Sequence, residues 1–399
     1  MLFSTFIGHR FALLFFGAWL SAAAAQTLEI PPTWMQTTSN SSREVRVDLA
    51  YGAASALLDQ VDPSVGVVPG IPTVQYLSNV FSVLAIQDYQ TRNNSWVSTV
   101  PKGMQDYYTS HGVYGDPPGR SGDANYWALA FYYAFRAYKQ DFLLVTAKEI
   151  YANTSATCFI APSAAANGTG AGRNVSFTPP SGCANGDFAG GVFVTNAVLN
   201  DLEVCGECVG PFMTLSAYLY EETNDTAYYE AAQLSADFMI RNMWTGSFVV
   251  DGFILSTCSA HQKPLTLNQA GFIEGLSVLA NVTNNGTLTA FLRDVVSNVT
   301  TYPAWSSAGG IIREDSNLSD WGYNMKGLFI RGLAEARVRN PGTDLARYIE
   351  AYIMVQFNGV LDNARGQAPN NNYYASSWST GEHATRVYFL RTVLPSSSA

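Results

Sequence analysis

Apolar residues recur along this chain with the period of helices that come in pairs. In each pair one segment is apolar on nearly every face and the next has one polar face, with a short Asn, Asp, Gly or Pro turn between them. A helix of the first kind must be buried, whereas one of the second kind suits a surface. The clearest pairs are Tyr126–Tyr138 with Phe142–Tyr151, Gly210–Glu222 with Ala227–Met243, Leu265–Val282 with Thr287–Val299, and Tyr323–Arg337 with Leu345–Phe357.

Further helices are predicted at Arg43–Val61, Val74–Tyr89, Val100–Ser110 and Thr380–Val393. An all-α (α/α)6 toroid of six hairpins, with apolar helices inside and amphipathic helices outside, satisfies the burial of every segment. An open solenoid of helix pairs is the alternative, but its repeats would be more regular in sequence. We therefore predict a single toroidal domain over residues 26–399.

One long segment departs from the helical pattern. Residues 158–203 are rich in Gly, Ala, Asn and Ser and predict a loop insertion with a short strand at most. A loop of this length inside a compact domain is usually functional or cross-linked. Here we expect a cross-link, and the insertion is a candidate for one rim of a substrate cleft.

The chain has five cysteines. Cys158 and Cys183 bracket the Gly-rich part of the insertion, so we predict a disulfide between them. Cys258 is expected to pair with Cys205 or Cys208, and the sequence leaves that choice open. A zinc or redox site at the C-x-x-C spacing is less favoured, because no second C-x-x-C or H-x-x-x-H accompanies it.

Residues 1–25 have the features of a secretory signal peptide. His9-Arg10 precede an apolar run, and Ala23-x-Ala25 suits cleavage before Gln26. The run is too short to span a bilayer comfortably, and the C-terminus lacks the apolar tail of a lipid-anchor signal. We therefore expect a secreted, extracellular protein without a membrane anchor.

Low charge and frequent N-x-S/T sequons predict a glycoprotein. Charged residues make up 13% of the chain, about half the usual share, so glycans would supply solubility. We expect N-glycosylation at Asn40, Asn93, Asn153, Asn167, Asn174, Asn224, Asn281, Asn285, Asn298 and Asn317. A net charge of −9 argues against nucleic acid and anionic membranes as partners. A neutral substrate, no cofactor or metal, and a monomer are expected.

Candidate chemistry lies where the buried helices begin, because the ends of inner helices surround the central cleft of a toroid. Asp123 is followed by Asn125, Tyr126 and Trp127 at the start of one such helix. Aromatic faces beside carboxylates and amides suit a neutral sugar. Glycoside hydrolysis usually needs two carboxyl groups. A structural alternative is that Asp123 merely caps the helix.

Two later helices carry similar groups. Asn268 and Gln269 lie near the start of one, and Lys326 and Arg331 lie on another. Since a buried cation needs a partner, these two basic residues are candidates for a site.

These clusters occur in strings that resemble glycoside hydrolase family 76, the α-1,6-mannanases of the six-hairpin glycosidase fold. The family signature D-D-x-x-W-W-x-L-A is matched by the nine residues from Gly122 to Ala130. Further matches, in the family's order, are Gly190-Gly191-Val-Phe, Leu267-Asn268-Gln269-Ala-Gly271, Gly309-Gly310-Ile-Ile-Arg-Glu314 and Lys326-Gly327-Leu-Phe-Ile-Arg331.

The resemblance implies a mannan endo-1,6-α-mannosidase-like hydrolase with Asp123 as general acid/base. Gly122 stands where the family has its nucleophilic Asp. Asp106, Glu203, Glu207 and Asp315 are possible replacements among which spacing does not choose. Substrate binding is implied for Asn125, Tyr126, Trp127, Asn268, Gln269, Lys326 and Arg331.

Two other functions remain open. The glycine in the signature is compatible with a catalytically silent protein that binds glycan. A polysaccharide lyase or unsaturated-uronide hydrolase would act on acidic sugars and needs a basic cleft, which the acidic composition disfavours.

Overall fold

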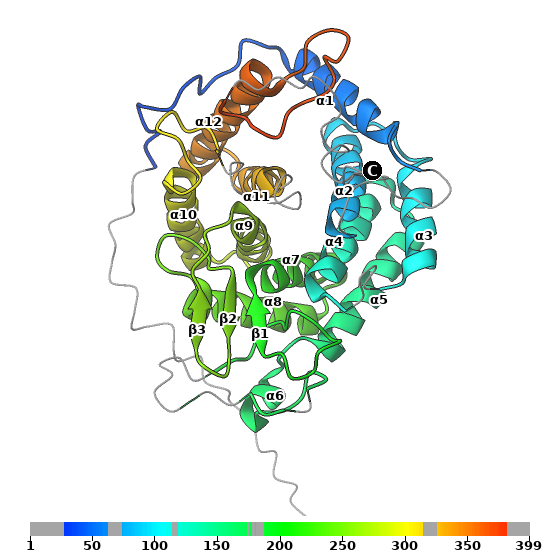
Figure 1. Ribbon diagram of the computed structural model, residues 1–399, viewed down its shortest axis with the longest axis vertical. Coiled ribbons are helices and arrows are strands. Elements are labelled where there is room, and N and C mark those ends of the chain that lie inside the picture. Colours follow the sequence, from blue (N-terminus) through cyan, green and yellow to red (C-terminus); the bar gives the residue numbers. More distant parts are fainter. Residues whose placement is uncertain are drawn as a thin grey trace, which may run out of the picture.

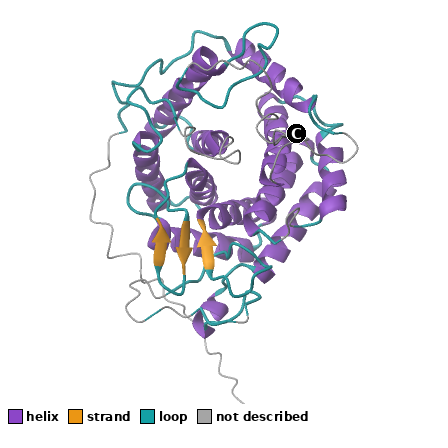
Figure 2. Cartoon of the chain, viewed as in Figure 1, coloured by secondary structure: helices purple, strands orange, loops and turns teal. Residues whose placement is uncertain are grey.

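The computed structural model describes residues 28–62, 74–113, 119–173, 175–177, 180, 187–313 and 325–380. Helices follow one another around a ring, and a small sheet lies beside it (Figures 1 and 2). The predicted signal peptide and the sequence after Thr380 lie outside the described residues, as do Cys183, Asn174, Asp315 and Asn317.

The predicted helices that fall within the described residues are present, and the all-α (α/α)6 class is confirmed. The helices are α1 (Arg43–Leu58), α2 (Val74–Thr91), α3 (Val100–His111), α4 (Ser121–Tyr138), α5 (Asp141–Thr157), α6 (Pro162–Asn167), α7 (Gly206–Thr223), α8 (Thr226–Phe238), α9 (Thr266–Val282), α10 (Gly286–Thr301), α11 (Met325–Arg339) and α12 (Asp344–Gly359). Short π-helical segments, Met239–Met243 and Val360–Ala364, extend α8 and α12. Among the described helices, none has the length and apolar character needed to cross a bilayer.

The ring has an inner and an outer layer. Helices α2, α4, α7, α9 and α11 pack in that order as inner neighbours, each preceded or followed along the chain by an outer helix (Figure 1). The inner helices α4, α7 and α9 are buried along most of their length, whereas the outer helices α8 and α10 keep one exposed face. The predicted division into apolar inner and amphipathic outer helices is therefore correct.

A groove of about 960 Å³ separates α2 from α11, with α1 and α12 behind it. Its walls are largely apolar, and Val83 and Val338 on these walls are exposed. The predicted helix Thr380–Val393 would supply a further inner helix, but all of it beyond Thr380 lies outside the described residues.

Glycines allow the inner helices to approach closely. A Cβ atom on Gly271 of α9 would lie 2.8 Å from the carbonyl carbon of Gly210 on α7. A Cβ atom on Gly332 of α11 would lie 2.5 Å from the carbonyl oxygen of Ala270. Backbone therefore meets backbone at both contacts, and only a residue without a side chain allows helices to approach this closely.

Three short strands form a sheet that was not predicted in full. Strands β1 (Glu203–Cys205), β2 (Gly252–Ile254) and β3 (Ser259–His261) are antiparallel in the order β1-β2-β3. Each strand has three residues, too few to give an alternating pattern in the sequence. The 158–203 insertion contains α6 and ends in β1, which leads directly into α7.

The cysteine predictions are wrong in their pairing. Cys205 and Cys208 are joined to each other, with Cα atoms 5.1 Å apart, because β1 turns directly into the first turn of α7. Cys258 is also disulfide-bonded, so neither of those two cysteines is its partner. Cys158 is a buried thiol at the end of α5, which rules out the predicted Cys158–Cys183 disulfide.

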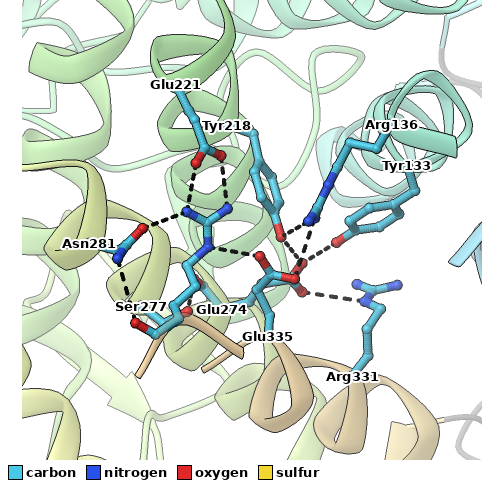
Figure 3. A network of polar contacts seen from close by, with 10 residues as sticks. Tyr133, Arg136, Tyr218, Glu221, Glu274, Ser277, Asn281, Arg331 and Glu335 are labelled. Carbon is cyan, nitrogen blue, oxygen red and sulfur yellow. Dashed lines mark hydrogen bonds and ion pairs between the residues drawn. The ribbon is translucent and has the colours of Figure 1, made fainter. Parts of the chain in front are cut away.

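A buried carboxylate and the arginine that pairs with it connect the described inner helices, and Figure 3 shows the contacts of this carboxylate on α4, α7 and α11. Glu274 of α9 accepts hydrogen bonds from Tyr133 of α4 and, at 2.9 Å, from Tyr218 of α7. Arg331 of α11 donates to its other oxygen at 3.3 Å and also donates to Asn79 of α2 at 3.1 Å. The Glu274 side chain is 1% exposed, so these partners replace the water that it has lost.

A second carboxylate extends this network toward the carboxyl ends of the same helices (Figure 3). Glu335 of α11 lies 3.4 Å from Arg136 of α4 and 2.8 Å from Arg339. Burial opposes its ionisation, but Arg136 and Arg339 outweigh that effect and lower the pKa of Glu335. Arg339 continues to Glu221 of α7 at 2.8 Å. Charges are thus paired from helix to helix through the interior.

We expect Glu274→Gln to lower the free energy of unfolding by about 3–5 kcal/mol, because Arg331 would keep its buried charge without a carboxylate. The matched control is Glu350→Gln, which removes an exposed ion pair with Arg337 and should cost less than about 1 kcal/mol. Urea denaturation of both variants measures the difference. Equal effects would contradict the role given to Glu274.

Gly271→Ala should cost about 1–3 kcal/mol, because the new methyl group would press on the backbone of α7. Gly327→Ala on α11 is the control: its Cβ atom would meet nothing within 4 Å, so improved helix propensity should add about 0.5–1 kcal/mol. Thermal unfolding of the two variants should therefore shift in opposite directions. A neutral Gly271→Ala variant would show that the contact of α7 with α9 can relax.

Candidate active site

Asp123 lies in the first turn of the inner helix α4. It is the third residue of the helix, while Arg120 occupies the N-cap position, so the structural alternative in which Asp123 caps the helix is wrong. Its side chain is nearly buried, with 9% of the residue exposed. Loss of solvation raises the pKa of Asp123 to about 6, and the positive charge of Arg120 opposes this shift. The carboxyl group therefore holds a proton in mildly acidic solution.

The neighbouring position on α4, Gly122, faces a carboxylate from another helix. A Cβ atom on Gly122 would lie 3.3 Å from the backbone oxygen of Glu207, 3.6 Å from its Cγ and 3.7 Å from its Cδ. Glu207 is in the first turn of α7 and is partly exposed. The carboxyl group of Glu207 thus occupies the space beside Gly122, the residue that immediately precedes Asp123.

The other predicted replacement carboxylates are placed differently. Asp106 forms an ion pair with Lys102 on the outer helix α3. Glu203 lies on β1 and pairs with His261 of β3 at 2.9 Å. Asp315 is outside the described residues. Of the three that are described, only Glu207 contacts the Gly122–Asp123 turn.

Two asparagines hold the starts of the inner helices together. Asn125 donates to the backbone oxygen of Cys208 at 3.1 Å, and Asn268 donates to Asp251 at 3.0 Å. Both side chains are buried, and the amide oxygen of each has no hydrogen-bond partner among the described residues. A buried acceptor of this kind is costly and is often found at a functional site. These two oxygens are candidates to receive sugar hydroxyl groups.

Tyr126 and Trp127 point to different sides of α4, as adjacent residues on a helix must. Tyr126 is buried in a small cluster with Leu265, Leu267, Ala270, Met325 and Leu328, where the starts of α9 and α11 meet α4. Trp127 stacks on Tyr107 of α3, with ring centroids 4.3 Å apart, and is 2% exposed. The expectation that Trp127 lines the cleft is therefore wrong, because its side chain packs between helices.

The remaining predicted binding residues are already engaged. The side-chain amide of Gln269 donates to the backbone oxygens of Val249 and Leu265, and its carbonyl accepts from the Val249 amide. Gln269 is fully buried and fastens the loop before α9. Lys326 donates to the backbone oxygen of Ser376. These contacts account for both side chains without a ligand.

Arg331 is buried within the Glu274 network, with its guanidinium group 5.0 Å from the ring centre of Tyr133 and 6.0 Å from that of Tyr126. Its first function is thus to neutralise Glu274. Contact with Tyr126 also connects this network to the start of α4, where Asp123 lies.

Neither Asp251 nor His261 was predicted from the sequence to be a site residue. Asp251 accepts from Asn268, and its backbone oxygen accepts from the Gly206 amide at 2.9 Å, so it connects the starts of α7 and α9. The only signal was an acid followed by a glycine before an apolar helix. Asp251 immediately precedes β2 and His261 ends β3. Because these strands have only three residues each, no periodic pattern pointed to either residue.

The sequence of residues 208–392 matches glycosyl hydrolase family 76. This segment begins at Cys208, so it includes Glu274 of α9 and Arg331 of α11 but neither Tyr133 nor Asp123 of α4. No curated protein is recognisably similar to the chain in sequence.

Solved structures share the fold at low sequence identity. An inactive variant of the α-1,6-mannanase GH76A of Salegentibacter sp. HEL1_6, with two consecutive aspartates changed to asparagine and α-1,6-mannotriose bound, superposes with a TM-score of 0.67 and 15% identity over 84% of this chain and 92% of that one. Dfg5 from Chaetomium thermophilum, in complex with glucosamine, gives 0.67 and 14% over 86% and 85%. The family 76 mannosidase Bt3792 from Bacteroides thetaiotaomicron VPI-5482 gives 0.61 and 13% over 85% and 92%.

The family match and the shared toroid agree with each other, since the matched segment supplies the second half of the ring. Residues 208–392 are thus similar to glycosyl hydrolase family 76, and the fold of the chain is like that of solved α-1,6-mannanases.

Proposed function

We propose that this protein is a glycoside hydrolase that cleaves α-1,6-mannosidic linkages in α-mannan or a related neutral glycan, with Asp123 as general acid/base. The observation that carries the proposal is the buried Asp123 carboxyl group at the start of an inner helix. Its pKa of about 6 keeps it protonated under mildly acidic conditions. A protonated carboxyl group in an apolar site can donate to the oxygen of a leaving sugar.

The substrate class rests on charge and on the relatives. The Salegentibacter mannanase holds α-1,6-mannotriose, a neutral sugar, in the same fold. This chain has a net charge of −9, which disfavours acidic polysaccharides. Asn125 and Asn268 offer two buried acceptors near the carboxylates, and a sugar hydroxyl is a suitable donor to such a group.

We also propose that the protein is secreted and N-glycosylated. Residues 1–25 carry the features of a signal peptide. Seven described sequon asparagines are exposed, as glycan attachment requires: Asn40, Asn93, Asn153, Asn167, Asn224, Asn281 and Asn285. Asn298 is only partly exposed, and its side chain donates to the backbone oxygen of Asp294.

A catalytically silent glycan-binding protein is the second candidate. Gly122 favours it, because the resemblance places a catalytic aspartate at that position. Calorimetry with α-1,6-mannotriose, together with product analysis after long incubation, separates the two functions. Binding without any product would select the silent protein.

We expect the wild-type protein to hydrolyse α-1,6-mannooligosaccharides and Asp123→Asn to lose at least about 10³-fold in kcat/KM, since an amide cannot transfer the proton. Asp106→Asn on the outer helix α3 is the matched control and should retain activity. Chromatography of the released sugars measures both. An Asp123→Asn variant with undiminished activity would exclude this residue from catalysis.

The raised pKa of Asp123 predicts how both activity and stability depend on pH. Activity should fall as pH rises above about 6, because only the protonated acid can donate. Since the pKa in the folded state exceeds the ordinary value of 3.8, the stabilising contribution of the group is complete below about pH 3.8 and is lost as pH rises through about 6.

Asp123→Asn should therefore be more stable than the wild type at pH 7.5, by on the order of 2–3 kcal/mol. The two proteins should be equally stable at pH 3.5. Urea denaturation at both pH values measures this difference, and a gap that is independent of pH would contradict the assigned pKa.

A further inference from the structure

Hydrolysis of a glycoside needs a second carboxyl group besides the proton donor, either as nucleophile or as base. In the signature that the chain resembles, this second group precedes Asp123, but here the position is Gly122, which has no side chain. If the protein is the hydrolase proposed above, another residue must bring a carboxylate to the position beside Gly122.

The space beside Gly122 contains the side chain of Glu207. Its Cδ, the carboxyl carbon, lies 3.7 Å from the position of a Cβ atom on Gly122. An aspartate at 122 would extend its own carboxyl carbon about 1.5 Å from that Cβ atom. Glu207 thus reaches from α7 into the neighbourhood that an aspartate side chain on α4 would occupy.

Several contacts fix the segment that carries Glu207. The disulfide between Cys205 and Cys208 encloses it on both sides. Asn125, two residues after Asp123, donates to the backbone oxygen of Cys208 at 3.1 Å. The Gly206 amide donates to the backbone oxygen of Asp251 at 2.9 Å. The starts of α4 and α7 are therefore joined at the residues next to the two carboxyl groups.

The two carboxyl groups have different surroundings. Asp123 is nearly buried, which favours its neutral form. Glu207 is partly exposed and lies in the first turn of α7, where the helix dipole favours a negative charge. Glycoside hydrolysis uses one carboxyl group as a proton donor and a second as a carboxylate.

We propose that Glu207 is the catalytic nucleophile, which supplies from α7 the carboxylate that Gly122 cannot supply from α4. Retaining glycosidases have their two carboxyl groups about 5–5.5 Å apart. Since Glu207 lies beside the residue that precedes Asp123, the proposal predicts retention of configuration.

The reaction then has two displacements. A Glu207 oxygen forms a bond to the anomeric carbon while the glycosidic C–O bond breaks, and the leaving oxygen takes the bond's electron pair and the proton of Asp123. Asp123, now ionised, removes a proton from water. The resulting hydroxyl oxygen bonds to the anomeric carbon, and the C–O bond to Glu207 breaks, which returns Glu207 as a carboxylate and Asp123 as an acid.

The first experiment compares Glu207→Gln with Glu203→Gln. Glu203 is the nearest alternative carboxylate, but it pairs with His261 on the sheet. We expect Glu207→Gln to lose roughly 10⁴-fold or more in kcat/KM and Glu203→Gln to change it by less than about tenfold. Circular dichroism and thermal unfolding check that both variants fold. An active, folded Glu207→Gln variant overturns the inference.

Moving the carboxylate back to α4 gives a sharper test. Glu207→Ala vacates the space beside Gly122, and adding Gly122→Asp fills it from the other helix. The double variant should recover at least about tenfold in kcat/KM over Glu207→Ala alone. If a folded double variant shows no recovery, the two positions are not equivalent and the inference fails.

The stereochemical outcome identifies the role. With an aryl α-1,6-mannobioside and azide, Glu207→Ala should form the β-mannosyl azide, because azide replaces the missing carboxylate on the same face. Proton NMR of the wild-type reaction should show the α-anomer first. If the wild type is active but inverts the configuration, the nucleophile assignment alone is overturned. The same holds if the wild type is active but a folded Glu207→Ala variant forms no azide product. A wild type inert toward all α-mannosides instead overturns the proposed function, and this inference with it.

Discussion

The buried carboxylate of Glu274 is the interaction on which the rest of the ring depends. It binds Tyr133, Tyr218 and Arg331, and Arg331 continues to Asn79, so five inner helices share one set of polar contacts. A shift of any of these helices by one turn would leave a buried charge or hydroxyl group without its partner, at a cost of several kcal/mol. The network therefore sets the heights of the helices relative to one another, and their starts are aligned at one end of the ring.

This alignment brings Glu207 of α7 beside Gly122, the residue that precedes Asp123 on α4. Tyr133 follows Asp123 by ten residues, or about 15 Å along α4, so the Glu274 network and the candidate active site occupy different depths of the interior. Glu274 is buried with an arginine beside it. Asp123 is also nearly buried, and the charge of Arg120 offsets only part of the lost solvation, so the pKa of Asp123 is raised. The same type of side chain is a structural support at one level and an acid at the other.

Gly122 and the short Cys205–Cys208 link are two parts of one arrangement. A residue without a side chain leaves room at the start of α4, and the disulfide holds the start of α7, with Glu207, against that space. The contact between Asn125 and Cys208 joins the two helix starts directly. The side chain that Gly122 lacks on α4 is in this way matched by the side chain of Glu207 on α7. The signature at the start of α4 contains only the glycine, so it does not indicate this carboxylate.

The sequence by itself determined the helices, their pairing and the division into inner and outer layers, because these follow from the spacing of apolar residues within one segment. It also singled out Asp123, which is nearly buried at the start of the inner helix α4. Only the tertiary structure decided that Glu207 is the carboxylate beside Gly122, that Trp127 packs against α3, and that Cys205 bonds to Cys208. Each of these depends on the direction of a side chain between elements, which local periodicity does not encode.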